Sequence, residues 1–313
     1  MWHLVSRRLL RGIPMVLVVS LLTFVLVSLS PGNPAVTLLG TNATSAQYAA
    51  VDRQLGLNLP LWSQYWHWLT GALQGRLGTS LYSSQSVSSI LGARLIVTLT
   101  LVILATMLSA VVGVALGVVS SLGNRGVSRT TDVVSMLGFA IPNFWLGLIL
   151  ILVFAEKLHL LPATGWIPFS SSPSGWLRSL ILPVVALAAA GATGIAKQTR
   201  DSMRDQLSQE YIFALRATGI SERTIVFRHA LRNAAIPVVT VIGLFFVGML
   251  GGAVLVEQIF ALPGLGSEAV AATSTHDLPV IQGVAICFAI IVVIVNLIIE
   301  VAYGWLNPKA RTR

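Results

Sequence analysis

The chain has 313 residues, a mean hydropathy of +0.83 and only 10% charged residues. Because soluble domains carry about 25% charged residues, this composition excludes an ordinary soluble protein and indicates an integral membrane protein. The net charge of +9 would suggest a nucleic-acid partner in a soluble chain, but in a membrane protein the location of the basic residues decides its meaning.

Six uncharged runs are long enough to cross a membrane, since a helical span needs about 20 residues at a rise near 1.5 Å each. These runs are 12–30, 95–124, 133–155, 179–196, 233–256 and 278–299. The fourth run is the shortest, and Arg178 and Lys197 at its ends can extend their charges toward the interfaces. We therefore expect an all-α integral membrane protein with six transmembrane helices.

The first run has one feature of a secretory signal peptide, because Arg7, Arg8 and Arg11 lie at its start. However, it is longer than a typical signal-peptide core of about 7–15 residues. It also lacks an A-x-A cleavage site and ends in "SLSPGNPA". We interpret it as a retained first transmembrane helix.

The distribution of the basic residues predicts which ends of the expected helices face the cytoplasm. If the N-terminus is inside, most Lys and Arg residues fall in inside segments, and the alternation holds at every turn, so both termini are expected in the cytoplasm. The inside residues are Arg7, Arg8, Arg11, Arg125, Arg129, Lys197, Arg200, Arg204, Arg216, Arg223, Arg228, Arg232, Lys309, Arg311 and Arg313; the outside ones are Arg53, Arg76, Arg94, Lys157 and Arg178.

The longest outside segment, 31–94, contains the aromatic stretch "LPLWSQYWHWLTGAL". Tryptophan and tyrosine favour the membrane–water interface. We therefore expect a helix here that lies along the outer surface of the membrane.

Several catalytic patterns are absent from the sequence. There is no G-x-x-x-x-G-K-[ST] loop for ATP, no H-E-x-x-H or C-x-x-C that would signal a metal site, and no G-x-S-x-G hydrolase motif. The runs carry no internal charge, which argues against an ion-coupled secondary transporter, because such proteins place ionisable groups within the membrane. An intramembrane hydrolase that uses Ser267 and His276 is an alternative, although both residues lie outside the expected spans.

The largest inside loop contains "EYIFALRATGISERTIVFRHALRNAAIP", which starts at Glu210. Ser208 is a candidate N-cap for a first helix, with Glu210 in its first turn, where the helix dipole favours an acid. Gly219 is expected to close that helix in a left-handed conformation.

A second helix is expected directly after this glycine. Ser221 is its candidate N-cap, and Ile220 and Ile225 occupy the two positions of a hydrophobic staple. Contact with anionic lipid head groups would explain the arginines but not a fixed corner between two helices. Short connections to the membrane argue against a DNA-binding helix-turn-helix. We favour a docking element for a cytoplasmic partner.

This stretch resembles the EAA loop of ABC importer permeases, and most closely that of the dipeptide/oligopeptide subfamily. The subfamily pattern is roughly E-Y-x-x-x-A-R-A-x-G, followed by R-H-x-L-x-N-x-x-x-P. The matching residues are Glu210, Tyr211, Arg216, Ala217, Gly219, Arg228, His229, Leu231, Asn233 and Pro237. Leu215 departs from the pattern, since the subfamily usually has alanine there, and it places a bulkier residue on the helix expected to dock.

The resemblance continues along nearly the whole chain. The segments "LSPGNPA", "LGLNLPLWSQYWHWLTGALQGRLGTS", "AIPNFWLG", "LPATGW" and "VEQIFALPGLG" follow one another in the order typical of the subfamily. Asn33 stands where aspartate is more usual. The presence of all the segments in order is far more specific than any one of them.

The resemblance implies the type I (MetI-like) ABC importer permease fold, with an extracytoplasmic loop domain after the first helix. The implied regions are a cytoplasmic N-terminus and first helix at 1–30, the extracytoplasmic region at 31–94, a five-helix permease core at 95–306 with the coupling loop at 197–232, and a cytoplasmic tail at 307–313.

The implied function is that of a non-catalytic permease subunit in the bacterial plasma (inner) membrane, which forms half of the path for di- and oligopeptides. The implied partners are a second, non-identical permease, two ATP-binding subunits that use ATP and Mg²⁺, an extracytoplasmic binding protein, and membrane lipid. This chain itself is expected to bind no cofactor, metal or nucleic acid. Import of nickel, glutathione or another small solute is an alternative within the same family.

Two groups of residues are implied as functional. The loop at 208–232 would couple to the ATPase through Glu210, Tyr211, Leu215, Arg216, Ala217, Gly219, Ser221, Arg228 and His229. The segment "VEQIFALPGLGS" would close an outer gate or contact the binding protein through Glu257, Phe260, Pro263, Gly264 and Gly266. Of this second group, the proline and the two glycines are expected to shape a tight turn.

Overall fold

A computed structural model describes residues 2–29, 32, 34–123, 126, 138 and 140–306. Apart from one isolated bridge between Thr79 and Ser86, every regular element in this part of the chain is helical. The elements are α1 (Trp2–Leu29), α2 (Pro34–Leu39), α3 (Ser45–Gln54), α4 (Leu61–Leu73), α5 (Val87–Leu122), α7 (Asn143–Leu150), the π-helix η1 (Ile151–Lys157), α8 (Pro173–Leu207), α9 (Glu210–Ala217), α10 (Glu222–Thr224), the π-helix η2 (Ile225–Ala230), α11 (Leu231–Ile259), α12 (Leu265–Thr275) and α13 (Leu278–Leu306).

Five described helices are long and apolar enough to cross a membrane: Gly12–Leu29, Val87–Leu122, Pro173–Leu207, Glu222–Ile259 and Leu278–Ala302. They coincide with most or all of the first, second, fourth, fifth and sixth predicted runs. The third run, 133–155, is only partly described, and its later half is helical in α7 and η1. The inside residues Arg125 and Arg129 and the tail at 307–313 lie outside the described residues, as do Pro31 and Asn33.

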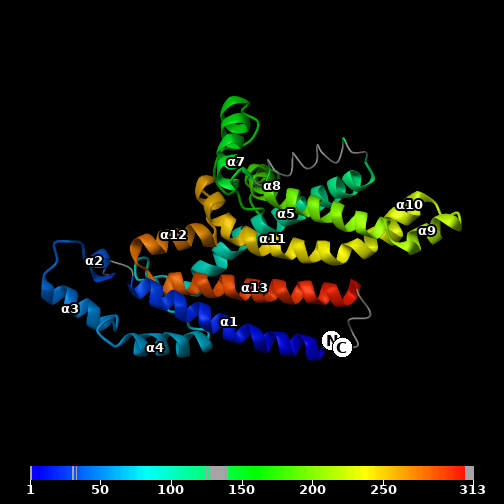
Figure 1. Cartoon of the computed structure of the whole chain (residues 1–313). Coiled ribbons are helices and arrows are strands. Elements are labelled where there is room, and N and C mark those ends of the chain that lie inside the picture. The colour runs from blue at the N-terminus through cyan, green and yellow to red at the C-terminus, as the bar shows by residue number, and fades with distance from the viewer. Residues whose placement is uncertain are drawn as a thin grey trace. The chain divides into compact units, whose positions relative to one another are not determined.

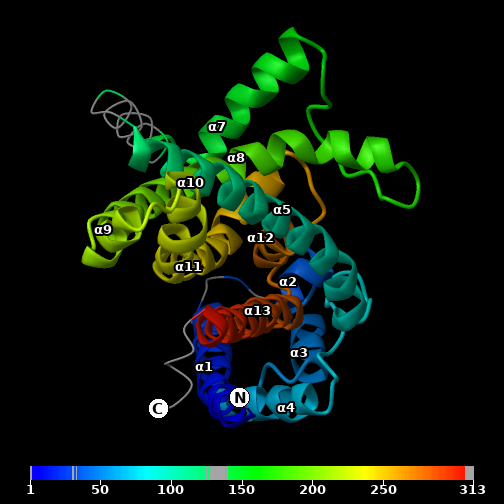
Figure 2. The same cartoon turned by 90° about the vertical axis from the view of Figure 1, so that its right-hand side faces the viewer.

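The described chain divides into two compact units. The first unit runs from Leu99 to Leu262 and resumes at Val295. Within it, α8 and α11 lie side by side over much of their length (Figures 1 and 2). The most apolar stretch of α8 is largely buried, so α8 is the central helix of this unit.

Small residues allow the helices of the first unit to approach closely. A Cβ atom at Gly113 of α5 would lie 2.7 Å from the carbonyl oxygen of Ala192 in α8, and one at Gly191 would lie 2.4 Å from the Cε of Met249 in α11. The hydroxyl of Ser109 in α5 donates a hydrogen bond to the carbonyl of Ala188 (2.8 Å). Such contacts are typical of membrane helices, where close packing and interhelical hydrogen bonds drive association.

The second unit comprises Trp2–Thr98 and Pro263–Ile294. Here α1 runs beside α13 (Figures 1 and 2), and Gly12 approaches Val293. The expected aromatic helix is present as α4. Its Tyr65 packs edge-on against Phe24 of α1, with 5.5 Å between ring centroids, and its hydroxyl lies 2.9 Å from the Ser20 hydroxyl. An ion pair between Arg94 and Glu268 (3.1 Å) joins α5 to α12.

Candidate coupling site

The predicted coupling residues lie between α8 and α11, where the chain folds as α9, a glycine corner, α10 and η2 (Figure 1). Ile212 and Ile225 are fully buried in a hydrophobic cluster with Met203 of α8 and Ala234 of α11. Leu215 packs against the same cluster. The apolar side chains therefore fix this segment to the ends of two long helices.

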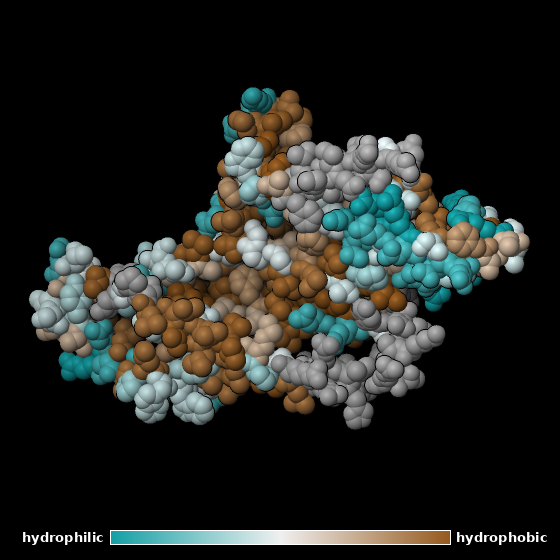
Figure 3. Space-filling view, in the orientation of Figure 1, coloured by the Kyte–Doolittle hydropathy of each residue, from teal (hydrophilic) through white to brown (hydrophobic). Residues whose placement is uncertain are grey.

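The opposite side of α9 is exposed. Glu210, Phe213, Ala214 and Ala217 follow one another at the spacing of a single helix face, and the structure exposes all four; we call them the outer face of α9. Phe213 is 58% exposed. Figure 3 shows hydrophilic surface around this end of the unit, so a large aromatic side chain stands exposed beside charged groups. The departure from the family pattern at Leu215 therefore alters the inward side of α9 and not its outer face.

The corner after α9 is a Schellman motif, a common way for a left-handed glycine to end a helix. Gly219 has φ +79, its N–H donates to the carbonyl of Arg216 (3.0 Å), and the N–H of Ile220 donates to the carbonyl of Leu215 (3.3 Å). Ile220 and Leu215 pack on the same cluster, which supplies the hydrophobic contact of the motif. The prediction of a left-handed glycine is confirmed.

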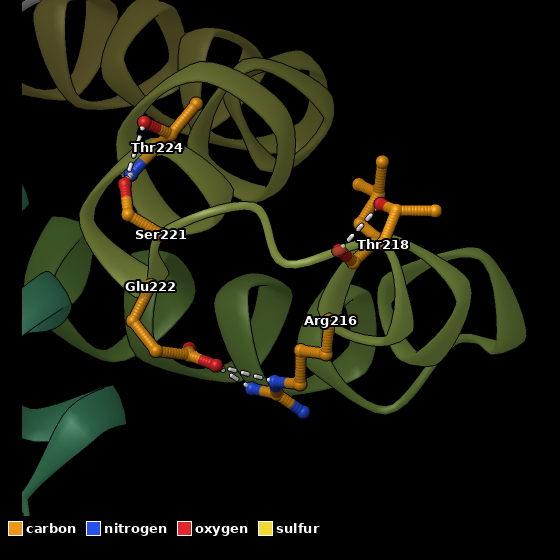
Figure 4. Close-up of polar contacts among 6 residues, drawn as sticks. Arg216, Thr218, Ser221, Glu222 and Thr224 are labelled. Atoms are coloured by element: carbon orange, nitrogen blue, oxygen red, sulfur yellow. Dashed lines mark hydrogen bonds and ion pairs between the residues drawn. The ribbon is translucent and has the colours of Figure 1, made fainter.

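The start of the second helix also follows the prediction. Ser221 is its N-cap, and its hydroxyl oxygen accepts a hydrogen bond from the N–H of Thr224 (3.4 Å) (Figure 4). Ile220 and Ile225 contact one buried cluster, as a hydrophobic staple requires. The helix then passes directly into the π-turn η2, which carries Arg228 and His229. π-Turns inside helices are frequent at functional sites.

The N-cap of the first helix was wrongly predicted. Ser208 is the C-cap of α8, and its hydroxyl donates to the carbonyl of Asp205 (2.9 Å). Gln209 is the residue before α9, and its side chain makes no capping hydrogen bond. The long helix α8 continues further than its apolar run, so it uses the serine that would otherwise begin α9.

A bidentate ion pair closes the corner. The Nε of Arg216 lies 2.6 Å from Oε1 of Glu222, and its Nη2 lies 3.2 Å from Oε2 (Figure 4). This hydrogen bonding lowers the pKa of the Glu222 carboxyl and raises that of the Arg216 guanidinium. Glu222 was not predicted as a functional residue from the sequence. The sequence did contain a signal for this ion pair, because Arg216 and Glu222 have opposite charges and lie on either side of Gly219.

Tyr211 connects three helices. Its hydroxyl donates to Oε1 of Gln206 in α8 (3.0 Å) and accepts from Nδ2 of Asn233 in α11 (3.0 Å). Both distances are those of good hydrogen bonds. Tyr211 therefore holds α9 in place, while the outer face remains available for contact.

The predicted outer-gate residues belong to different compact units. In the first unit, Glu257 and Phe260 are buried at the end of α11, and the N–H of Gly165 donates to the carbonyl of Phe260 (2.8 Å). A Cβ atom at Gly147 of α7 would lie 3.1 Å from the Phe260 ring. Ala261 is the left-handed residue of this segment, with φ +50.

In the second unit, Pro263 precedes Gly264, which is the N-cap of α12 in an extended conformation (φ -98, ψ -177). The N–H of Leu265 donates to the Thr98 hydroxyl (2.7 Å). Gly266 is buried and lies inside α12, so the prediction that it shapes a tight turn was wrong. The helix begins earlier than the glycine pattern suggested.

The residues of the hydrolase alternative lie at opposite ends of α12. Ser267 is in its first turn, where its hydroxyl donates to the carbonyl of Gly264 (2.9 Å), and His276 is the residue after its last turn. Nine residues of helix place them on the order of 13 Å apart, too far for a nucleophile and its base. In the part of the chain that the structure describes, no three His, Cys, Asp or Glu side chains gather as metal ligands would.

Comparison with known proteins gives consistent matches. The family described as "Binding-protein-dependent transport system inner membrane component" matches residues 110–312, and the corresponding N-terminal family matches residues 1–102. A putative peptide transport system permease protein of Brucella abortus (strain 2308) is 38% identical over 312 residues, 99% of each chain. The glutathione transport system permease protein GsiC of Salmonella typhimurium (strain LT2) is 39% identical over the same coverage.

A probable peptide ABC transporter permease protein of Sinorhizobium fredii (strain NBRC 101917 / NGR234) is 37% identical over 308 residues, 98% of each chain. Among solved structures, a chain of the MetNI methionine ABC transporter in an inward-facing conformation matches with a TM-score of 0.56 and 16% identity. The match covers 70% of this chain and 97% of that chain. At this identity, the likeness concerns the fold alone.

Proposed function

This chain belongs to the family of binding-protein-dependent transport system inner membrane components, and from that premise we propose that it imports di- and oligopeptides as the permease subunit of an ATP-driven ABC importer. The family membership and the fold match confirm the predicted resemblance and the type I permease fold. The chain is a non-catalytic, multi-pass protein of the bacterial plasma (inner) membrane.

Relatives similar over almost their whole length support the peptide assignment. Those at 37–38% identity carry names of peptide transport permeases, and one at 39% is named for glutathione. Peptide-like substrates, which contain amide bonds, are therefore favoured as the imported molecules. Import of nickel or another small solute is the alternative.

We also propose that the loop at 208–232 docks on an ATP-binding partner and transmits its movement. The observation that carries this proposal is the outer face of α9. Phe213 is exposed beside charged residues, while the Schellman motif and the Arg216–Glu222 pair hold the corner in one geometry. An exposed apolar residue on a rigid element is typical of an interface anchor.

The proposed assembly follows from the family. A binding-protein-dependent permease works with a substrate-binding protein and with subunits that hydrolyse ATP, so we assign ATP and Mg²⁺ to those partners. We propose two ATP-binding subunits and a second, non-identical permease. We propose that 1–30 forms the cytoplasmic N-terminus and the first transmembrane helix, that 31–94 lies outside, that 95–306 forms the five-helix permease core with the coupling loop at 197–232, and that 307–313 is a cytoplasmic tail. The segment from Glu257 to Gly266 is assigned to an outer gate or a binding-protein contact.

The substrate is tested by transport. The chain, its partner permease, ATP-binding subunits and binding protein are reconstituted in lipid vesicles, and ATP-dependent uptake is compared for a labelled dipeptide, glutathione and Ni²⁺. We expect the dipeptide to accumulate. Accumulation of Ni²⁺ without the dipeptide would replace the peptide assignment with the small-solute alternative.

A further inference from the structure

The second compact unit contains a partly open cavity of about 480 Å³ that no function assigned above uses. It lies between the end of α1, the turn after α3, α4, and the first turns of α13. Phe24, Leu57, Leu81 and Pro279 supply part of its apolar wall. Its volume falls in the range of about 300–1,000 Å³ that is typical of small-molecule sites.

Two residues that line this cavity carry buried polar groups with no hydrogen-bond partner in the described part of the chain. Gln282 of α13 is only 2% exposed, and among the described residues neither atom of its amide has a hydrogen-bond partner. The indole N–H of Trp68 in α4 is buried and also has no partner among the described residues. Both residues line the cavity. Because an unsatisfied buried polar group is costly, their presence together on one apolar wall points to a ligand that supplies the missing partners.

The charged residues that line the cavity indicate the sign of the charge on its ligand. The described residues lining the cavity include Arg53 and Arg76, and no aspartate or glutamate. The Nε of Arg53 donates to the carbonyl of Ala49 (3.0 Å), and Nη2 of Arg76 donates to Gln74. A guanidinium has five N–H donors, so each arginine has donors beyond these bonds that can meet an anionic group.

The hydrogen bonds that the Gln282 side-chain amide needs restrict the chemical class of the ligand. The Gln282 side chain needs both an acceptor for its NH₂ and a donor for its oxygen. A secondary amide supplies one of each, and a carboxylate satisfies a guanidinium. An acyl chain would fill the apolar volume but would leave Gln282 and Trp68 unpaired.

We propose that this cavity binds small carboxylates that carry a secondary amide beside an apolar group, as short peptides and N-acyl amino acids do. Gln282 pairs with the ligand amide, Trp68 donates to an acceptor, and the arginines meet the carboxylate. The proposal rests on the cavity and not on the proposed transport function. Peptide uptake and binding at this cavity are therefore measured separately, and either can fail alone.

The test uses the full chain in lipid nanodiscs and isothermal titration with two probes, N-acetyl-leucine and the dipeptide Ala-Leu. Decanoate, which has a carboxylate but no amide, is the comparison ligand. We expect saturable binding of at least one amide probe, and the preferred probe identifies whether a peptide or an acylated amino acid is the source. Decanoate should bind more weakly.

The decisive variant is Gln282→Leu, which removes the amide and keeps a similar volume. We expect at least about a tenfold loss of affinity for the amide probe and a Tm equal to or above that of the parent, because an unsatisfied buried group has been replaced by an apolar one. Trp68→Phe keeps an aromatic ring and should also weaken binding. Gln85→Leu, at an exposed glutamine outside the cavity, should leave both binding and Tm unchanged.

Three results would overturn the proposal. They are the absence of saturable binding by the parent, parental affinity in Gln282→Leu, or a clear fall in Tm for that variant, which would make Gln282 a structural residue. Stronger binding of decanoate that survives Gln282→Leu would assign the cavity to lipid acyl chains instead.

Discussion

Gly219 and the Arg216–Glu222 pair determine the geometry of the coupling loop at the level of single residues. The glycine takes the left-handed conformation that ends α9, and the ion pair joins the two sides of the corner. Neither Arg216 nor Glu222 is deeply buried, so the pair is expected to orient the corner more than to stabilise the whole fold.

Gly219→Val should misdirect the corner. No atom lies within 4 Å of a Cβ built at this position, so the cost comes from the backbone, roughly 1–2 kcal/mol for a residue in the left-handed region. We expect normal membrane insertion but weaker copurification of the ATP-binding subunits. Gly219→Asn is the matched control, because asparagine tolerates this conformation. Equal copurification by the parent and both variants would show that the corner geometry does not matter for docking.

The stabilising contribution of the Arg216–Glu222 pair should decrease as the pH falls. The hydrogen bond from Arg216 lowers the pKa of Glu222, so its stabilising contribution is present above the ordinary pKa of glutamate and is lost as the pH falls through the lowered value. A double-mutant cycle of Arg216→Ala and Glu222→Ala, followed by thermal unfolding, should give a favourable coupling at pH 7 that disappears at an acidic pH where the Glu222 carboxylate is protonated. Coupling that is the same at both pH values would contradict the assignment to this carboxylate.

At the scale of elements, local patterns predicted the corner well and the helix boundaries less well. The left-handed glycine, the Ser221 cap and the staple depend on neighbouring residues, so the sequence was sufficient. The cap at Ser208 failed because α8 extends beyond its apolar run, and tertiary packing on Met203 supports that extension. The sequence also could not reveal that Leu215 faces inward, because the core-facing residues and the proposed docking surface lie on opposite sides of one short helix.

Substitutions in the segment between α11 and α12 test whether it acts in transport as the proposed outer gate or binding-protein contact. Gly264 is buried but has backbone angles that any residue can adopt, so the double substitution Pro263→Ala and Gly264→Ala changes shape and flexibility without a left-handed penalty. We expect reduced peptide uptake with normal assembly of the complex. Unchanged uptake at normal expression would leave this segment as a plain connection between helices.

At the scale of the whole molecule, hydropathy and charge predicted the class of protein and its orientation. The five described helices able to span a membrane overlap five of the predicted runs over most or all of their length, and the family matches cover residues 1–102 and 110–312. The cavity beside Gln282 was not predicted, because it depends on segments distant in sequence that meet only in the folded chain.

Orientation is tested by cysteine labelling from either side of the membrane. In a Cys287→Ser background, Ser221→Cys should react only with a reagent on the cytoplasmic side, and Ser171→Cys only with one outside, because the basic residues place the coupling loop inside. Both positions are exposed. The Cys287→Ser protein alone measures background labelling, and the reverse pattern would remove both the orientation and the proposed docking surface.

We propose that the outer face of α9 couples this permease to ATP hydrolysis, and the most direct test of this coupling is to measure hydrolysis by the assembled complex in lipid vesicles. Parent protein should respond to substrate-loaded binding protein with faster hydrolysis. Glu210→Arg should abolish that response, because it reverses a charge on the outer face and opposes the dipole at the start of α9. Glu156→Arg, an exposed charge reversal on the predicted outside, should respond like the parent. If Glu210→Arg copurifies with the ATP-binding subunits and responds like the parent, the loop is not the coupling element.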